Sequence, residues 1–385
     1  MLSNLSKNVK LNGIKYHSLL LAFGAALSVA LFLLVLGWNF GSLIRPAVEW
    51  QEQLIFGQRQ ELDNFSHLPL ASVRPPQGVF LFFGDVMIDR NVGKKIKENG
   101  FDYLLTKLAG EDKQFFQGAD LVGANLEGAV TDGGAHYSPA VPYDFAFAPA
   151  LVVRFQDYGF NFFSIANNHL TDQGSAGVEE TEKNLADLGF NFVGCPDAVA
   201  GGPCSSRIIS VGDLTVGAVG LSMVYHNFDL PAAEALVKDL KSQTDLVIVN
   251  LHWGNEYEHQ FNRYQQAVGR ALIDAGADII IGHHPHVVQG VEVYRGRPIF
   301  YSLGNFIFDQ YFSPDTQTGL AVKINAFPEK FVFQLLPLRS SASQVELMPE
   351  DAKTKFLSDF ASWSAVEPAV AERLKQGEFE FIKQN

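Results

Sequence analysis

The chain has 385 residues, of which 47% are hydrophobic and 18% charged, and its formal net charge is −13. These values are typical of a globular protein with one or two domains, and they exclude a wholly disordered chain. Because binding to a phosphate backbone needs a basic surface, the acidic balance argues against nucleic acid as a partner. A polyanionic substrate would need metal ions or a local basic patch to receive it.

The N-terminus carries an uncharged apolar run over residues 18–36, long enough to span a hydrocarbon core of about 30 Å. Three lysines precede it: Lys7, Lys10 and Lys15. The positive-inside rule therefore predicts a cytoplasmic tail at 1–15 and a transmembrane signal anchor at 16–40. The chain would then be a single-pass protein of the cell membrane, with its main domain outside the cytoplasm. A cleaved signal peptide is the alternative, but the apolar core is longer than usual and no clear small-x-small site follows it.

The rest of the chain divides into a linker, a main domain and a tail. Residues 41–77 end in the breaker-rich segment around Pro75 and Pro76, which is typical of a linker. The main domain is expected at 78–340 and closes with a final strand near 331–338. Residues 341–385 are predicted to be a helical extension, because apolar residues recur at helical spacing from position 350 onward.

Short apolar runs in the main domain are each followed by a polar cluster. The runs are Val79–Phe83, Leu121–Ala124, Phe160–Ala166, Val216–Leu221, Leu246–Leu251, Asp278–Ile281 and Ile299–Leu303. Such runs are typical of strands covered on both faces. Amphipathic segments predict helices at Pro149–Tyr158, Val178–Leu188, Pro231–Lys241 and Arg263–Ala275. The pattern predicts a layered α/β fold with mixed sheets, in which the polar clusters converge beyond the carboxyl ends of the strands.

Histidines dominate the strongest polar clusters. His284-Pro-His286 lets two imidazoles face one centre, and His169 follows two asparagines in the cluster after an earlier run. His252 ends another run, and a divalent metal is the commonest reason to gather histidines. Asp85 and Glu127 stand at further strand ends, where each alone is a weak signal. The mixture of oxygen and nitrogen ligands suits Mn, Fe, Zn or Mg rather than a metal held by thiolates.

Other chemistries find less support. The sequence contains neither a Gly-x-Ser-x-Gly nucleophile elbow nor a Walker-type Gly-Lys-Ser/Thr. Its two cysteines, Cys195 and Cys204, lie nine positions apart in a Gly/Pro-rich stretch. Outside the membrane they would form a disulfide or stay free, and the sequence leaves both outcomes open.

Six ordered motifs resemble the CapA family of poly-γ-glutamate capsule biosynthesis proteins, which are related to calcineurin-like metallophosphoesterases. They are Gly84–Met87, Asn125–Glu127, Ala166–Gly174, His252–Tyr257, Gly282–Gln289 and Tyr301–Phe306. The resemblance extends from about residue 79 to 338. It implies a four-layer αββα sandwich of the metallo-dependent phosphatase type, and a site for two divalent metal ions.

The resemblance also implies roles for individual residues. The implied metal ligands are Asp85, Glu127, Asn168, His252, His284 and His286, and His169 is the implied proton donor. Nearby, Arg90, Asn125, Glu256 and His283 are expected to contact substrate. Met87 departs from the pattern, because the superfamily has a histidine there. One metal subsite would thus lack a nitrogen ligand, for which His283 or Glu256 is the candidate replacement.

Two functions follow. The first is an extracytoplasmic metal-dependent hydrolase of a phosphoester or γ-glutamyl substrate, with the metals activating water and a histidine protonating the leaving group. The second is a non-catalytic subunit of a polymer synthesis and export complex, which binds a polyanion through its metal. Expected partners in either case are the membrane, membrane-bound capsule synthase subunits, and an anionic polymer or phosphorylated substrate.

Overall fold

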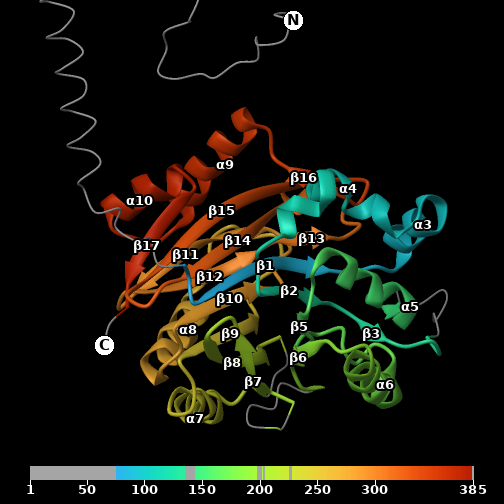
Figure 1. Cartoon of the computed structure of the whole chain (residues 1–385), viewed down its shortest axis with the longest axis horizontal. Coiled ribbons are helices and arrows are strands. Elements are labelled where there is room, and N and C mark those ends of the chain that lie inside the picture. Colours follow the sequence, from blue (N-terminus) through green and yellow to red (C-terminus); the bar gives the residue numbers. More distant parts are fainter. Residues whose placement is uncertain (1–74, 135–143, 197–201, 203, 225–227, 384–385) are drawn as a thin grey trace, which may run out of the picture. The chain divides into compact units, whose positions relative to one another are not determined.

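The computed structural model describes residues 75–134, 144–196, 202, 204–224 and 228–383 (Figure 1). The predicted cytoplasmic tail, the signal anchor and all but the end of the linker lie outside these residues. Within them, the helices are all too short or too polar to cross a membrane.

Two large sheets and one small sheet form the framework. The larger sheet has the order β16 (Gln344–Leu347), β15 (Lys330–Ser341), β14 (Thr318–Ala326), β1 (Gly78–Val86), β2 (Leu121–Leu126), β5 (Phe162–Ser164) and β6 (Asn191–Val193), with β13 (Asn305–Ile307) beside β1 and β17 (Glu378–Ile382) beside β15. The second has the order β11 (Val288–Tyr294), β12 (Arg297–Leu303), β10 (Ile279–His283), β9 (Leu246–His252), β8 (Leu214–Ser222) and β7 (Ser206–Val211). Strands β3 (Ala129–Val130) and β4 (Ala146–Phe147) pair separately.

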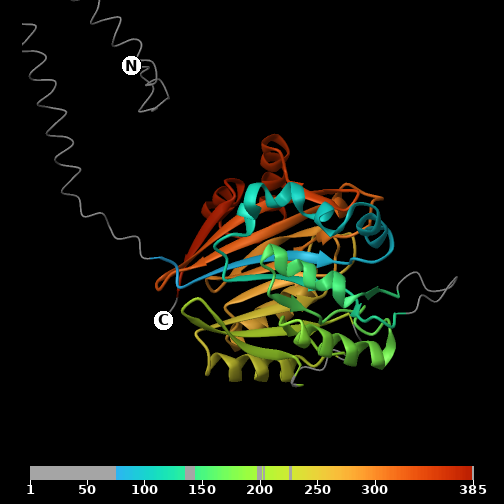
Figure 2. The same cartoon turned by 45° about the vertical axis from the view of Figure 1, so that its right-hand side comes forward.

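The two large sheets face each other across an apolar core. Alternate residues of β1 point to opposite faces, so Phe80 and Phe82 enter this core while Leu81 and Phe83 face the other way. The outer face of the larger sheet packs against α3 (Arg90–Asn99), α4 (Thr106–Ala109), α5 (Pro149–Val152) and α6 (Gly174–Asp187). Helices α7 (Leu230–Lys241) and α8 (Arg263–Ala275) cover the outer face of the second sheet (Figure 2).

Most elements predicted from the sequence are present. The seven apolar runs form β1, β2, β5, β8, β9, β10 and β12, and the last two predicted helices are α7 and α8. The helix predicted at Pro149–Tyr158 is α-helical only over α5, and the rest of it, Val153–Tyr158, is a 3₁₀ helix. The α/β class with several sheets is therefore confirmed.

The C-terminal segment differs from its prediction. Helices α9 (Glu350–Trp363) and α10 (Pro368–Lys375) do form, and their apolar faces pack into the core between the sheets. The helical prediction for the residues after Lys375 is wrong, however, because β17 follows and pairs with β15. Phe379 stacks on Phe333 at 4.8 Å between ring centroids, while Glu380 faces solvent. That alternation has the period of a strand.

A close backbone contact between Gly84 and Gly304 fixes the end of β1, where Asp85 lies. A Cβ at Gly84 would lie 1.8 Å from the carbonyl oxygen of Gly304, so only glycine lets β1 and the start of β13 approach this closely. The pairing of β1 with β2 shifts register between Phe82 and Asp85 at this point. The Asp85 backbone N–H donates to the Gly304 carbonyl (3.0 Å), which fixes the position from which the aspartate side chain projects.

Cys195 and Cys204 form a disulfide, with their Cα atoms 5.1 Å apart. The Gly194 backbone N–H also donates to the Cys204 carbonyl (2.7 Å), so the start and end of this loop are joined twice. The sequence left open whether the two cysteines are bonded or free, and in the structure they are bonded.

We expect the full-length chain, kept in a zwitterionic detergent, to show no thiol that iodoacetamide can alkylate until a reductant is added. The double variant Cys195→Ser/Cys204→Ser should fold but lose about 2–3 kcal/mol of unfolding free energy, because an unlinked loop of this length gains entropy in the unfolded state. Mass spectrometry and denaturant titration measure the two effects. Rapid double alkylation of the unreduced native chain would contradict the assignment.

Candidate metal centre

Polar side chains from both large sheets meet at the carboxyl ends of parallel strands. Asp85 on β1 lies in register with Asn125 on β2 and with Asn305 on β13, and all three strands run parallel. In the second sheet, His283 on β10 lies beside His252 on β9. Parallel strands present their carboxyl ends at one edge, which explains why residues some 220 positions apart lie together.

Two buried carboxylates form the floor of the site. The Asn125 side-chain amide donates to Asp85 Oδ1 (2.8 Å) and, at 3.4 Å, to Glu127 Oε2. The imidazole of His286 lies between the acids, with Nδ1 3.5 Å from Asp85 Oδ2 and Nε2 3.8 Å from Glu127 Oε1. One ligand atom from each of these three residues lies within 4.8 Å of the others, so they form a first group able to hold a cation.

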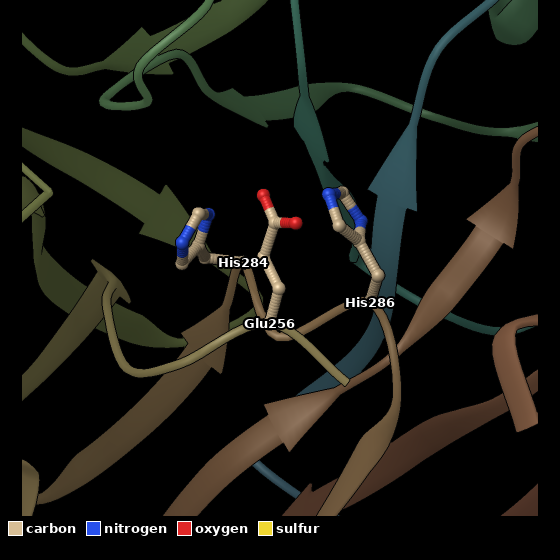
Figure 3. A group of neighbouring side chains, drawn as sticks. All are labelled: Glu256, His284 and His286. Carbon is tan, nitrogen blue, oxygen red and sulfur yellow. The ribbon is translucent and has the colours of Figure 1, made fainter. Parts of the chain in front are cut away.

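A second group shares His286 with the first. Glu256, His284 and His286 offer ligand atoms that also lie within 4.8 Å of one another. Figure 3 shows the Glu256 carboxylate between the two imidazole rings. Glu256 is exposed whereas the histidines are buried, so this group faces the opening of the site. The structure thus places Glu256, expected from the sequence as a substrate contact or a replacement ligand, among the possible metal ligands.

The remaining expected ligands lie against these groups. His252 Nε2 is 2.7 Å from Asn168 Oδ1, and the His252 and His284 rings are 4.7 Å apart between centroids. Asn167, which belongs to the predicted Ala166–Gly174 motif but was given no role of its own, donates to Asn125 Oδ1 (3.1 Å) and accepts from the His169 backbone N–H (3.1 Å). It therefore holds the loop after β5 against the end of β2.

Backbone strain is concentrated at this edge. Four residues of the site have positive φ angles although none is glycine: Arg90 (47°), Tyr257 (65°), His284 (97°) and His286 (57°). Such conformations cost of order 1–3 kcal/mol each and persist only where neighbouring contacts enforce them. The His284 backbone N–H donates to Asp85 Oδ2 (3.2 Å), and the Tyr257 N–H donates to the Pro285 carbonyl (2.8 Å). These contacts hold the histidine loop in its strained form.

The donor set fits a divalent cation. Among the described residues, Glu127 Oε1, His284 Nδ1 and His283 Nε2 are buried with no hydrogen-bond partner, and leaving such atoms unsatisfied is costly. Burial, together with the charges of Asp85 and Glu256, raises the pKa of Glu127 well above its ordinary value. A cation would remove that penalty by compensating the charge of the buried carboxylate.

Burial lowers the pKa of His252, His284 and His286, which favours the neutral form that binds metals. Burial lowers the pKa of His252 well below its usual value, and burial and the neighbouring His286 lower the pKa of His284 to about 4. Burial alone would raise the pKa of Asp85, but His283, His286 and Asn125 outweigh it and hold that pKa below its ordinary value. A charged aspartate thus lies beside neutral imidazoles.

Asn305 fixes the orientation of the shared histidine and was not among the predicted site residues. Its side-chain amide donates to Gln310 Oε1 (3.0 Å) and to the Thr316 carbonyl (2.9 Å), so its Oδ1 must accept from His286 Nδ1 (2.9 Å). The proton is then on Nδ1 and the Nε2 lone pair faces Glu127. In metal sites, a hydrogen bond of this kind orients the metal-binding histidine. The sequence did contain a sign of this role, because Asn305 lies in the predicted Tyr301–Phe306 motif, just after the apolar run that ends at Leu303.

Met87 occupies a different environment from the acidic floor. Its side chain is fully buried in the core under the larger sheet, and its sulfur accepts from the Asp89 backbone N–H at 3.1 Å. The departure noted in the sequence is therefore a residue that packs in the core.

His169 and Arg90 line the cavity in front of the metal groups. His169 Nδ1 is 2.8 Å from Asp172 Oδ2, and its Nε2 is 3.7 Å from Glu127 Oε1. The Arg90 guanidinium forms an ion pair with the buried Asp309 and lies over the Phe145 ring at 4.8 Å. Asp172 lies in the predicted Ala166–Gly174 motif but was given no role there, and Asp309, two residues beyond β13, lies outside the predicted motifs.

Known proteins match over the same region. The family of bacterial capsule synthesis proteins PGA_cap matches residues 79–310. The chain belongs to this family. The PGA biosynthesis protein CapA of Bacillus subtilis (strain 168) is 33% identical over 242 residues, which are 60% of this chain and 63% of that protein. The capsule biosynthesis protein CapA of Bacillus anthracis is 34% identical over 246 residues, 59% of each chain. The predicted membership of the CapA family is thus confirmed.

The match to these CapA-family relatives spans about three-fifths of their length. A solved structure, that of a hypothetical protein from Thermus thermophilus, aligns with a TM-score of 0.42 and 18% identity over 70% of this chain and all of that one. At that TM-score the likeness adds nothing to the assignment of the site.

We expect the full-length chain to bind about two Mn²⁺ or Zn²⁺ ions, and His286→Ala to weaken chiefly the site at Asp85 and Glu127, because the lone pair on His286 Nε2 faces Glu127. Glu256→Gln should weaken one site only. Asn305→Ala should lower affinity by about 10- to 100-fold through the lost orientation of His286. Elemental analysis after dialysis and metal titration measure these effects.

His259→Ala is the matched control, because that histidine contacts Trp363 and the Val288 carbonyl and belongs to neither metal group. Its metal content should equal that of the unmodified chain. Equal metal content in the unmodified chain and in His286→Ala would show that bound metal lies elsewhere.

Proposed function

We propose that the chain is a metal-dependent hydrolase that acts in capsule synthesis, on a phosphoester or γ-glutamyl substrate, outside the cytoplasm. The single observation that carries this is the pair of metal groups joined by His286, with buried ligand atoms that lack partners among the described residues. The relatives are named for PGA and capsule biosynthesis, which supports the biological setting.

The arrangement of layers supports a four-layer αββα sandwich of the metallo-dependent phosphatase type. The implied metals are two divalent ions, Mn, Fe or Zn. Asp85, Glu127 and His286, the last through its Nε2, would hold one, and Glu256 and His284 the other, with His252 and Asn168 beside them. A divalent ion in such a site supplies Lewis acidity toward the scissile group and makes water a stronger nucleophile.

The protein's own groups then handle the proton and the substrate. Asp172 Oδ2 accepts from His169 Nδ1 and from the Phe145 backbone N–H (2.9 Å), so the carboxylate fixes the imidazole ring. His169 Nε2 is thereby directed toward the cavity, where it is placed to give a proton to the leaving group. Arg90 provides the positive charge among the residues that line the cavity, and we assign it to an anionic group of the substrate.

Localisation follows from two features. The disulfide Cys195–Cys204 is typical of an oxidising compartment, and the apolar run at 18–36 precedes the domain in the orientation described above. We therefore propose a membrane-anchored protein whose domain lies outside the cytoplasm. Its proposed partners are the membrane, membrane-bound synthase subunits and the anionic polymer itself.

A second candidate is a non-catalytic subunit that binds a polyanion through its metal. Met87 is the observation that favours it, since the core-packed thioether offers no ligand where the superfamily has a histidine. The His169–Asp172 pair favours the hydrolase, because a binding surface alone has no need to keep a proton donor oriented beside the ligands.

We expect the metal-loaded, full-length chain to hydrolyse either bis-p-nitrophenyl phosphate or γ-glutamyl-p-nitroanilide. His169→Ala should lower kcat on that probe by about 10²- to 10⁴-fold with metal content unchanged, because it removes the proton donor and no ligand. Asp172→Asn should give a smaller fall, since the imidazole remains but loses its orientation. Release of p-nitrophenol or p-nitroaniline reports the rate.

The control is again His259→Ala, which should retain the full rate. Turnover of neither probe by a fully metal-loaded chain would favour the binding subunit. Turnover that survives His169→Ala undiminished would remove this histidine from the mechanism while leaving the hydrolase assignment intact.

A further inference from the structure

The cavity in front of the metal groups has an aromatic wall. It has a volume of about 280 Å³, and Phe145, Tyr257, Phe308 and Phe312 line it together with polar residues. Tyr257 and Phe312 form its rim and meet edge to face, with 5.4 Å between ring centroids. Phe312 is 69% exposed and Tyr257 46% exposed, which is unusual for two large aromatic side chains in contact. A volume of this size admits a single ring-sized group.

The rim is connected to the metal ligands by hydrogen bonds. Gln310 Nε2 donates to the Tyr257 hydroxyl (3.3 Å), Asn305 donates to Gln310 Oε1, and Asn305 in turn orients His286. The backbone N–H of Tyr257 donates to Pro285, between the two histidines of the loop. The Tyr257 and His286 rings lie 6.2 Å apart between centroids. The rim therefore adjoins His286, one of the residues of the metal groups.

We propose that the Tyr257–Phe312 rim binds a neutral sugar ring of the substrate, so that the metal centre acts on a group attached to a carbohydrate. A pyranose has an apolar C–H face that packs on aromatic rings and a polar edge of hydroxyls. The cavity offers both counterparts, since the side-chain amides of Asn91 and Gln310 and the Glu256 carboxylate stand beside the aromatic wall. This inference rests on the proposed function and deepens it by naming the substrate class.

Charge argues for a neutral ring rather than a polyanion at the rim. The lining contains one cation, Arg90, and two carboxylates, Asp309 and Glu256. Arg90 shares its charge with Asp309 and can receive at most one anionic group, so a segment with several carboxylates resting on the rim would meet Glu256 without further compensation. An acyl chain would also be a poor occupant. It would bury the Asn91 and Gln310 amides and the Glu256 carboxylate against hydrocarbon, where they would lack hydrogen-bond partners.

The test is saturation-transfer NMR on the metal-loaded, full-length chain in a detergent without a sugar headgroup. The probes are methyl β-glucopyranoside, methyl N-acetyl-β-glucosaminide and γ-glutamylglutamate. We expect transfer to the ring protons of at least one pyranoside, and a dissociation constant about two- to tenfold weaker in Phe312→Ala. Tyr264→Ala is the matched control, since Tyr264 is also exposed (59%) but lies on α8 outside the cavity.

The outcomes separate this inference from the proposed function, because the measurement needs no turnover. Transfer to neither pyranoside, or transfer that Phe312→Ala leaves unchanged, would overturn the sugar assignment even in an active hydrolase. Transfer to γ-glutamylglutamate that depends on Phe312 would overturn it in favour of an amide-linked polymer. Phe312-dependent pyranoside binding by a chain that hydrolyses nothing would support the rim and contradict the hydrolase.

Discussion

The buried pair of carboxylates at the ends of β1 and β2 is the constraint on which the rest of the site depends. Asp85 and Glu127 are both fully buried, and their side chains share the Asn125 amide. Two acids in such a position repel each other and lose their hydration, so the fold must supply positive charge or protons. Neutral histidines carry no charge to compensate the two acids, but they can bind a cation that does. The need for a cation explains why carboxylates and histidines are buried together at this edge of the two sheets.

The strand ends could be predicted because each rests on a local signal. A buried strand needs a continuous apolar run, and the first polar residue after that run marks the edge of the sheet, as at Asp85 and His252. The residues that orient the ligands could not be found in this way. Asp172 and Asp309 lie in loops, Asn305 begins the short strand β13, and Asp309 meets Arg90 across 219 positions of sequence. Strand β17 was missed for another reason: the Glu/Phe alternation of Glu378–Ile382 has the period of a strand, but the helical spacing of the residues before it was extended to the end of the chain.

The site and its rim together suggest how specificity and chemistry are divided. In the proposed function the floor would provide charge and buried ligands, the His169–Asp172 pair would provide an oriented proton, and the rim would select what is brought to them. Side-chain hydrogen bonds link these parts, as in the series from Tyr257 through Gln310 and Asn305 to His286. Strain in the histidine loop is consistent with this division, because it is found at residues that face the cavity. Family membership places this assembly in a capsule synthesis protein.

The most direct measurement is anomalous X-ray scattering, at the absorption edge of the bound metal, from crystals of the full-length chain grown with Mn²⁺ or Zn²⁺. The account predicts two peaks on either side of His286, one between Asp85 and Glu127 and one between Glu256 and His284. A fully formed histidine cluster with no anomalous peak at saturating metal, or peaks only at surface carboxylates, would contradict it.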